Sequence, residues 1–347
     1  MRLLLCGGSL LLLFVACWRV TPLEKPLKTY RIGLGSCAKQ TKEQPILYTV
    51  VQAQPDVFIY LGDNIYGDTR DMEELQAKYQ QLAAKPSFQA LKEQVPLLAT
   101  WDDHDYGEND AGCYYPYKEQ SKALFLDFWE EPKTSTRWQH EGIYHALFLE
   151  DAPLRLQVIL LDTRTFRDDL THLEKKKNSP YKNDYQPTSS PDSTFLGKEQ
   201  WVWLEEQLKQ PADVRLIASS NQFAHQYNGW ESWTNVPHEQ KHFLQLIQKT
   251  QANGIVFLSG DVHWGELSCW KNPYTYPIYD LTSSGLTQNW PDTEPNAHRI
   301  GKVVRQNNFG LIDLELSPQD TILTFQLVDK KNKKQLQHKI KLSELQF

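Results

Sequence analysis

Residues 57–68 read VFIYLGDNIYGD, five apolar residues followed at once by a glycine and a run of mostly polar residues. A continuous apolar run of this length is typical of a strand that is buried on both faces, as in the parallel sheets of α/β proteins. The polar turn then lies at the carboxyl end of the strand, where open α/β sheets place their functional sites. This stretch therefore predicts an α/β fold with its chemistry at strand ends.

Further apolar runs of similar length are expected to form strands. They cover residues 31–34, 96–100, 154–161, 214–218 and 255–259. Between them, apolar residues recur at helical spacing around positions 72–82, 201–208 and 243–247. Strands that alternate with helices in this way indicate an α/β layered domain.

A single domain is expected to span residues 28–347. Its last part contains three runs that are predicted to be antiparallel strands, at 310–315, 321–328 and 335–342. Residues 309–347 are therefore expected to complete a sheet. Residues 178–194 are rich in Ser, Pro, Asn and Asp, which predicts a long surface loop.

The composition excludes several classes of protein. The chain has 347 residues, with 37 Lys and Arg against 43 Asp and Glu and a formal net charge of -6. A hydrophobic content of 40% and a charged content of 23% exclude disorder along the whole chain. A polytopic membrane protein is also excluded, because it needs several long apolar segments and the sequence has one, residues 3–15. The slight acidity gives no reason to expect a nucleic acid as partner. It does not exclude an anionic substrate, because an acidic protein can still contain a small cationic site such as a metal cluster.

Residues 1–17 are predicted to be an export leader. Arg2 precedes the apolar run, whose length suits a signal peptide better than a membrane span. Residues 14–17, FVAC, resemble a bacterial lipobox, which predicts a lipid anchor through Cys17. Cleavage near Ala16 without a lipid is the alternative. Either interpretation predicts an exported protein, in the periplasm, secreted or anchored to the membrane surface.

The leader leaves Cys37, Cys113 and Cys269 in the folded part of the chain. An odd number leaves one thiol free or available as a ligand while the other two can pair. We expect Cys113 and Cys269 either to form a disulfide or to remain two unpaired buried thiols. Cys37, directly after a predicted strand, is then the candidate ligand.

Clusters of Asp, His, Asn and Cys follow most of the predicted strands. They read GSC (35–37), GDNIYGD (62–68), WDDHDYGEND (101–110), SSNQ (219–222) and GDVHW (260–264). Because the carboxyl ends of neighbouring parallel strands meet at one edge of a sheet, these clusters are expected to converge. Side chains of these types, once gathered, predict a metal site.

Two metal ions held about 3.5–4 Å apart need a bridging carboxylate and several terminal ligands. Asp63, in the turn directly after a strand, is the natural bridge. Asp261 and His263 alternate along the chain, so both can face one side of an extended backbone. Cys37 offers a thiolate and Tyr66 a phenolate, ligands that suit iron.

The remaining candidates offer oxygen or a proton. Asn221 and Asp103 carry oxygens that suit a harder ion such as calcium. Asp102 is the alternative to Asp103 as the ligand, and the other of the two would cap the following turn. His104 would stay free of metal and donate a proton to a leaving oxygen. Asp105 is a candidate to orient it.

This set of motifs resembles that of the alkaline phosphatase D (PhoD-like) metallophosphatases. The matching pieces follow the family's order over roughly residues 30–290. They are GSC (35–37), GDNIY (62–66), WDDHD (101–105) with Asn109, LDTR (161–164), LG (196–197), QW (200–201) with Leu204, SNQ (220–222) and GDVH (260–263). One departure is the turn Gly67-Asp68 after Tyr66, where many members carry an acidic residue directly after the tyrosine.

The resemblance implies a four-layer α/β/β/α metallophosphatase (calcineurin-like) sandwich with mixed sheets. It also implies an exported enzyme that hydrolyses phosphate esters at alkaline pH with Fe³⁺ and Ca²⁺. Carried over by position, the iron ligands would be Cys37, Asp63, Tyr66 and His263. The calcium side would be served by Asp63, Asp103, Asn221 and Asp261.

The mechanism expected from this set is attack by a metal-activated hydroxide in line with the leaving group, without a covalent enzyme intermediate. His104 would protonate the leaving alkoxide, or else would serve only as a structural hydrogen-bond partner. Asn64 and Asn109 are expected to contact phosphate oxygens, and Arg164 to bind the substrate or steady the site.

Two other functions are alternatives to the hydrolysis of a small phosphate monoester. The same site could act on phosphodiesters or phospholipid head groups, because cleft width rather than metal arrangement separates these substrates. A non-catalytic surface lipoprotein that binds a ligand is the second rival. The intact set of acidic and histidine residues argues against it. The sequence leaves the oligomeric state open.

Overall fold

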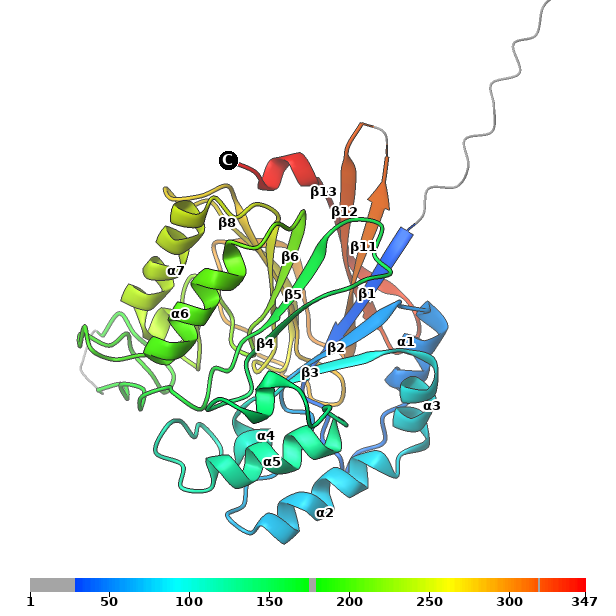
Figure 1. Cartoon of the computed structure of the whole chain (residues 1–347), viewed down its shortest axis with the longest axis vertical. Helices are drawn as coiled ribbons and strands as arrows, with labels where there is room; N and C mark the ends of the chain where they lie inside the picture. The colour runs from blue at the N-terminus through cyan, green and yellow to red at the C-terminus, as the bar shows by residue number, and fades with distance from the viewer. Residues whose placement is uncertain (1–28, 175–178, 318) are drawn as a thin grey trace, which may run out of the picture.

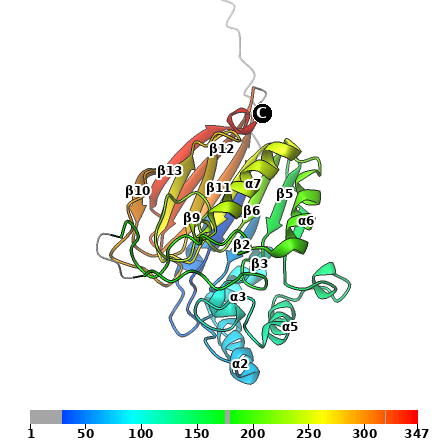
Figure 2. The same ribbon diagram turned by 90° about the vertical axis from the view of Figure 1, so that its left-hand side faces the viewer.

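The computed structural model describes residues 29–174, 179–317 and 319–347, which form two β-sheets with helices on their outer sides (Figures 1 and 2). The six-stranded sheet has, in spatial order, β13 (Lys334–Lys341), β12 (Thr321–Asp329), β11 (Asn308–Leu316), β1 (Thr29–Gly35), β2 (Val57–Leu61) and β3 (Leu97–Thr100). The seven-stranded sheet has β10 (Arg299–Val304), β8 (Gly265–Trp270), β9 (Ile278–Ser283), β7 (Ile255–Ser259), β6 (Val214–Ala218), β5 (Leu156–Leu160) and β4 (His145–Phe148).

Both sheets are mixed, which confirms the expected α/β fold with mixed sheets. β1, β2 and β3 are parallel to one another, whereas β11, β12 and β13 continue that sheet in antiparallel pairs beside β1. In the second sheet β5, β6, β7 and β9 are parallel, and β4, β8 and β10 are antiparallel to their neighbours. The parallel strands of each sheet thus carry their polar turns at the same edge.

The helices come from the segments between strands. They are α1 (Ile46–Ala53), α2 (Met72–Ala83), α3 (Pro86–Gln94), α4 (Asp103–Tyr106), α5 (Lys118–Phe128), α6 (Gly197–Leu208) and α7 (Pro237–Thr250), with 3-10 turns η1 (Thr136–Trp138), η2 (Trp233–Asn235) and η3 (Leu342–Leu345). α1 and α3 lie outside the six-stranded sheet, and α6 and α7 lie outside the other (Figure 1).

The core explains why the strands are apolar on both faces. Val57, Ile59 and Leu61 of β2 belong to the cluster that also contains β5, β6 and β7, whereas Phe58 and Tyr60 belong to the cluster around α1 and α3. Successive side chains of a strand point to opposite faces. Every residue of β2 is therefore buried, and the polar turn that follows is the first place where this segment can carry chemistry.

Local signals set the helix ends. The side chain of Asp71 accepts hydrogen bonds from the backbone N–H groups of Glu73 and Glu74, which caps α2. Leu75, Tyr79 and Leu82 then recur on its buried face.

All of the segments predicted as strands are strands, with ends that differ by at most two residues. The sequence did not predict β4, β8, β9 and β10 or α1, α3, α4 and α5. Several of these elements are short or lie at an edge, as β4 and β10 do. β8, with the sequence GELSCW, mixes apolar and polar residues, so it lacks the continuous apolar run of a central strand.

The two cysteines that were candidates for a disulfide are both free and half-buried. The thiol of Cys113 lies 3.8 Å from Asp168 Oδ1, and Cys269 lies on β8, opposite Tyr279 of β9. They occupy different parts of the fold. The alternative of two unpaired thiols therefore holds, although neither is fully buried.

The leader and its lipobox cysteine, Cys17, lie outside the described residues. In the part of the chain that is described, none of the helices combines the length and apolar character that a membrane span requires.

Candidate metal centre

The predicted polar clusters converge where the carboxyl ends of the parallel strands of both sheets meet. Cys37 follows β1, Asp63 follows β2, and Asp261 follows β7. The thiol of Cys37 donates to Asp63 Oδ2 at 3.3 Å and lies 3.7 Å from the carbonyl oxygen of Asp261. The two sheets therefore bring together side chains that are more than 220 residues apart in the chain.

One half of the site contains the sulfur and nitrogen donors. The phenol of Tyr66 lies 3.4 Å from Asp63 Oδ2 and 3.0 Å from Nε2 of His263. Ligand atoms of Cys37, Asp63 and His263 all lie within 4.8 Å of one another. A single ion could contact all of them at ordinary bond lengths.

The other half contains oxygen donors. Asp63 and Asp103 offer oxygens within 4.8 Å of each other and of a His104 ring nitrogen, and Asp103 makes a second such group with Asp102 and Asp261. Asp63 thus takes part in one group on each half, as a bridging carboxylate must. Asn221 follows β6 and is completely buried.

The two adjacent aspartates, Asp102 and Asp103, have different surroundings. Asp102 stands at the N-cap position of α4, and its Oδ1 accepts hydrogen bonds from Arg164 and Ser220. Asp103 lines the cavity, and its Oδ2 accepts the backbone N–H of Asp110 at 2.8 Å. The geometry favours Asp103 over Asp102 as the ligand.

The backbone is strained at these positions. Cys37, Asp63, Asp261 and His263 all have positive φ, at 61°, 51°, 69° and 62°. Residues other than glycine rarely adopt this conformation, and when they do they cluster at functional sites. Gly62 before Asp63 has a φ of 99°, and a Cβ there would lie 2.5 Å from that of Asp102. The turn after β2 therefore requires its glycine.

Several buried atoms that could bind a metal have no hydrogen-bond partner in the described part of the chain. Asp63 Oδ1, Asp103 Oδ1 and the whole side-chain amide of Asn221 are buried without a hydrogen bond among the described residues. Burial raises the pKa of Asp63, and the neighbouring Cys37 and Asp103 raise it further. Burial likewise raises the pKa of Asp261, and it raises the pKa of the Cys37 thiol to about 12. Unpaired buried acceptors and crowded carboxylates are stabilised by a bound cation, so these residues fit a metal centre.

His104 lies beside this cluster, in contact with Tyr66 and Asp68. Its Nδ1 lies 2.6 Å from Asp68 Oδ1, and its ring centroid is 4.2 Å from that of Tyr66. Burial alone would lower the pKa of this histidine, but Asp103 and Asp68 outweigh burial and raise it to about 9. In metal-free protein His104 is therefore mostly protonated below about pH 9.

The residue that orients His104 is Asp68, and not Asp105 as the sequence suggested. Asp105 accepts hydrogen bonds from the backbone N–H groups of Asn64, Ile65 and Asp102. These bonds tie the turn after β2 to the turn after β3. Asp105 therefore shapes the backbone under the site, while the carboxylate of Asp68 accepts the Nδ1 proton of His104.

A cavity of about 180 Å³ opens above the cluster. It is lined by Asp63, Asp103, His104, Asn109, Asp110, Asp184, Tyr185, Trp230, Glu231, Asp261, Val262, His263 and Trp290. Cys37, Tyr66 and Asn221 are buried and are not part of this wall. Asp184 and Tyr185 show that the 178–194 segment, expected as a plain surface loop, contributes to the site.

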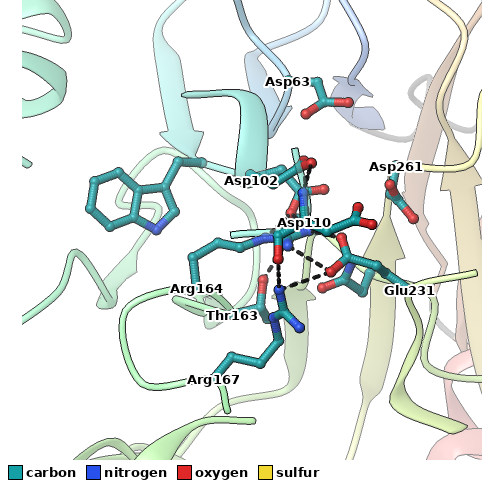
Figure 3. A network of polar contacts seen from close by, with 12 residues as sticks. Asp63, Asp102, Asp110, Thr163, Arg164, Arg167, Glu231 and Asp261 are labelled. Carbon is teal, nitrogen blue, oxygen red and sulfur yellow. Dashed lines mark hydrogen bonds and ion pairs between the residues drawn. The ribbon is translucent and has the colours of Figure 1, made fainter. Parts of the chain in front are cut away.

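Arg164 lies in a buried network of ion pairs. It is completely buried, and its guanidinium is bound by Asp102 and by both oxygens of Glu231, with Nη1 to Oε1 at 2.8 Å (Figure 3). Arg167 lies 3.0 Å from the same Glu231 oxygen. Arg164 is not among the residues that line the cavity, and its guanidinium faces internal carboxylates.

The two asparagines predicted to contact phosphate are placed differently. Asn109 is exposed and lines the cavity. Asn64 is completely buried, and its Nδ2 donates to the carbonyl oxygen of Thr100 at 3.0 Å. Asn64 therefore links β3 to the turn after β2 and does not line the cavity.

Several residues of the site were missed by the sequence analysis. Asp68 and Asp110 stand in the polar clusters quoted above, so their proximity to the site was visible although their roles were not. Glu231, Asp184 and Trp290 belong to loops with no motif.

His225, four residues after Asn221, is buried under the site. Its Nδ1 accepts the backbone N–H of Tyr227 at 3.0 Å, and its Nε2 lies 3.7 Å from Glu266 Oε1. Burial lowers the pKa of His225 to about 4, against the attraction of Glu266. His225 is outside the cavity wall and has no place in the metal centre.

The depressed pKa of His225 predicts a loss of stability in acid. The unfolded chain takes up the proton near pH 6.5 and the folded chain only near pH 4, so stability is complete above pH 6.5 and declines as the pH falls. The decline attributable to this group is about 3 kcal/mol. His225→Asn should flatten urea-unfolding free energies measured from pH 7 to pH 4, whereas His242→Asn, at an exposed position, should not. Identical slopes in wild type and His225→Asn would contradict this.

Comparison with known sequences finds a family that matches most of this chain. The sequence model of the PhoD-like phosphatases matches residues 32–294, a range that includes every candidate ligand described above. The curated protein "Alkaline phosphatase D" of Bacillus subtilis (strain 168) is 25% identical over 257 residues, which covers 60% of this chain and 41% of that protein. The match thus spans less than half the length of that relative.

Solved structures show the same fold. A structure described as that of PhoD superposes with a TM-score of 0.68 at 17% identity, covering 90% of this chain and 72% of that one. GAP50, described as the anchor in the inner membrane complex of Plasmodium, superposes with a TM-score of 0.58 at 12% identity, covering 90% of this chain and 89% of that one.

Proposed function

Because this chain belongs to the PhoD-like phosphatase family, we propose that it is a metal-dependent hydrolase of phosphoric esters built on the four-layer α/β/β/α metallophosphatase sandwich. The observation that supports this most is that Asp63, Asp103 and Asn221 have buried acceptor atoms with no hydrogen-bond partner among the residues that the structure describes, beside a cavity that His104 also lines.

The donor chemistry supports the two ions named from the sequence. Fe³⁺ would be held by Cys37, Asp63, Tyr66 and His263, because thiolate, phenolate and imidazole suit a transition metal. Ca²⁺ would be held by Asp63, Asp103, Asn221 and Asp261, which offer oxygen. When bound, such ions neutralise the charge of the phosphate and activate the attacking water.

The chain's own residues then handle binding and the proton. Asp68 fixes the ring of His104 through Nδ1, so the second ring nitrogen is the one left to protonate the leaving oxygen. Asn109, on the cavity wall, is placed to donate to a phosphate oxygen. Arg164 holds Asp102 and Glu231 in position from behind.

Metal content and hydrolysis, measured together, test the proposal. Protein lacking residues 1–17 should contain iron, show a thiolate or phenolate charge-transfer band and hydrolyse phosphate monoesters or diesters near pH 8–10 in a calcium-dependent way. The monoester-to-diester ratio decides between the two ester classes. Protein that binds neither ion and stays inactive after both are supplied would refute the proposal and favour a binding protein.

His104→Gln tests the general acid. We expect kcat to fall about 10²–10⁴-fold, because the leaving oxygen would depart unprotonated. The loss should be smaller for an ester such as 4-nitrophenyl phosphate, whose leaving group is a weak base. Asp68→Asn, which keeps the ring but weakens its orientation, should cost less than His104→Gln. A fall below about tenfold for His104→Gln, equal for all leaving groups, would leave only a structural role.

Export is the remaining part of the proposal. The leader-like sequence of residues 1–17 supports it, with a lipid on Cys17 as the anchor. Fatty-acid labelling of the full-length chain in a bacterial host tests the anchor, and an unlabelled, unprocessed chain would contradict it.

A further inference from the structure

Two tryptophans from separate loops form one wall of the cavity. Trp230 lies in the loop between β6 and α7, and Trp290 lies in the loop after β9. Both line the same cavity as His104, Asp63 and His263. With Val262, they are the apolar part of a wall that is otherwise made of carboxylates, imidazoles, Asn109 and a tyrosine.

The two indole rings stack on each other, and one of them contacts a residue of the candidate metal centre. Their centroids are 5.5 Å apart with an interplanar angle of 21°, a stacked arrangement. The ring of Trp290 also lies 5.3 Å from that of His263. Backbone hydrogen bonds hold both loops, from Trp290 N–H to the carbonyl of His263 and from Trp230 N–H to Asn228 Oδ1.

Packing alone does not explain this pair. Trp233 and Trp264, which serve the core, are almost completely buried, and their indole N–H groups donate to Ser219 and Glu266. Trp290 is instead 43% exposed, and Trp230 is also partly exposed. Large apolar rings that stay open to solvent in the wall of a site mark a binding surface.

The position of the pair relative to the charges indicates which part of a ligand it meets. The phosphoryl group belongs at the carboxylate cluster, where the cations bind. Trp290 lies against the ring of His263, so it is about one ring away from that cluster. The group attached to the ester oxygen is then the part that reaches the indoles, and an aromatic ring is the group that gains most from aromatic contact.

We propose that Trp230 and Trp290 bind the alcohol part of the substrate and make the site selective for phosphate esters that carry a flat aromatic ring over esters of small aliphatic alcohols. This inference rests on the proposed function, because it assigns the substrate class of the same site.

Matched substrates and variants test the selectivity. kcat/KM would be measured for phenyl phosphate and glycerol 2-phosphate with wild type, Trp230→Ala and Trp290→Ala. Comparing each variant with wild type on one substrate cancels the intrinsic reactivity of the ester. We expect a loss of about tenfold for the phenyl ester and less than about threefold for the glycerol ester. Tyr114→Ala, at an aromatic residue that is 71% exposed and outside the cavity, is the control and should change neither.

Conservative variants separate selectivity from folding. Trp230→Phe and Trp290→Phe keep an aromatic ring and should retain most of the preference for the phenyl ester. Equal losses on both substrates, in alanine and phenylalanine variants alike, would overturn the proposal and assign the pair to packing. Unchanged kinetics in every variant would also overturn it.

A binding measurement keeps this inference distinct from the proposed function. Calorimetric titration with phenylphosphonate and methylphosphonate needs no turnover. Wild type should bind the phenyl compound about tenfold more tightly than the methyl compound, and the alanine variants should lose that difference. If wild type hydrolyses neither ester but prefers phenylphosphonate, the proposed hydrolase function is refuted and the aromatic-ring site at Trp230 and Trp290 is supported. If hydrolysis is found without any preference, the ring site fails and the function stands.

Discussion

Asp63→Asn is expected to lower kcat/KM by at least about 10³-fold, because the metal centre then loses the carboxylate shared by its two halves. Cys37 and Tyr66 both contact Oδ2 of Asp63, while its Oδ1 is buried and has no hydrogen-bond partner in the described part of the chain. A neutral amide has one oxygen and no charge to offer, so we expect fewer bound ions per chain, with the loss measurable by elemental analysis.

The same variant should behave in the opposite way when no metal is present. Burial and the neighbouring carboxylates raise the pKa of Asp63, so its ionised form is unfavourable in metal-free protein. Asp63→Asn should therefore leave the free energy of unfolding of metal-free protein unchanged or increase it. Asp127→Asn, at an exposed carboxylate paired with Lys133, is the matched control and should affect neither activity nor metal content.

A metal-replete Asp63→Asn enzyme with activity within tenfold of wild type would refute the bridging role. A variant that is inactive and also strongly destabilised without metal would show instead that Asp63 is needed for folding.

The second large effect is expected on stability. Arg164→Met should lower the free energy of unfolding by about 3–5 kcal/mol, because it leaves the buried Asp102 without its arginine and Glu231 with Arg167 as its remaining arginine partner. Arg164 is completely buried, Asp102 is as well, and Glu231 is 3% exposed. The long methionine side chain preserves much of the packing volume, so the change reports mainly on charge.

Urea denaturation of metal-free protein measures this effect. Arg70→Met is the control, since the pair Arg70–Glu108 is exposed, with 61% of the arginine side chain accessible, and its loss should change the free energy of unfolding far less. Similar midpoints for the two variants would contradict the role given to Arg164. The network joins the turn after β3 to the loop that carries Trp230, so its loss should also reduce the order of the cavity wall (Figure 3).

Much of the candidate site could be predicted because the signal is local. Asp63 follows five buried residues, and Asp261 with His263 follows another five. An apolar run forces a buried strand, and parallel strands bring their carboxyl ends to one edge. The gathering of these residues with Cys37 and Asn221 thus follows from pattern and topology alone.

The rest could not be predicted because it depends on contacts between distant segments. Asp105 is the direct neighbour of His104 in the chain, whereas Asp68, the residue that does pair with His104, lies 36 positions away in another turn. The burial of Arg164 between Asp102 and Glu231 joins three loops. An arginine beside an aspartate motif has the same appearance in sequence whether it meets substrate or an internal carboxylate.

The sequence by itself therefore determined the α/β class, the strands that carry the site and the residue types that make a metal centre, because periodicity and strand-end placement are encoded over a few neighbouring residues. The tertiary structure alone decided that Asp102 contacts Arg164 while Asp103 lines the cavity, which carboxylate contacts His104, and that Trp230 and Trp290 form one wall. These features arise when two sheets pack together, and the free energy of packing depends on all of the surfaces that meet rather than on any one segment.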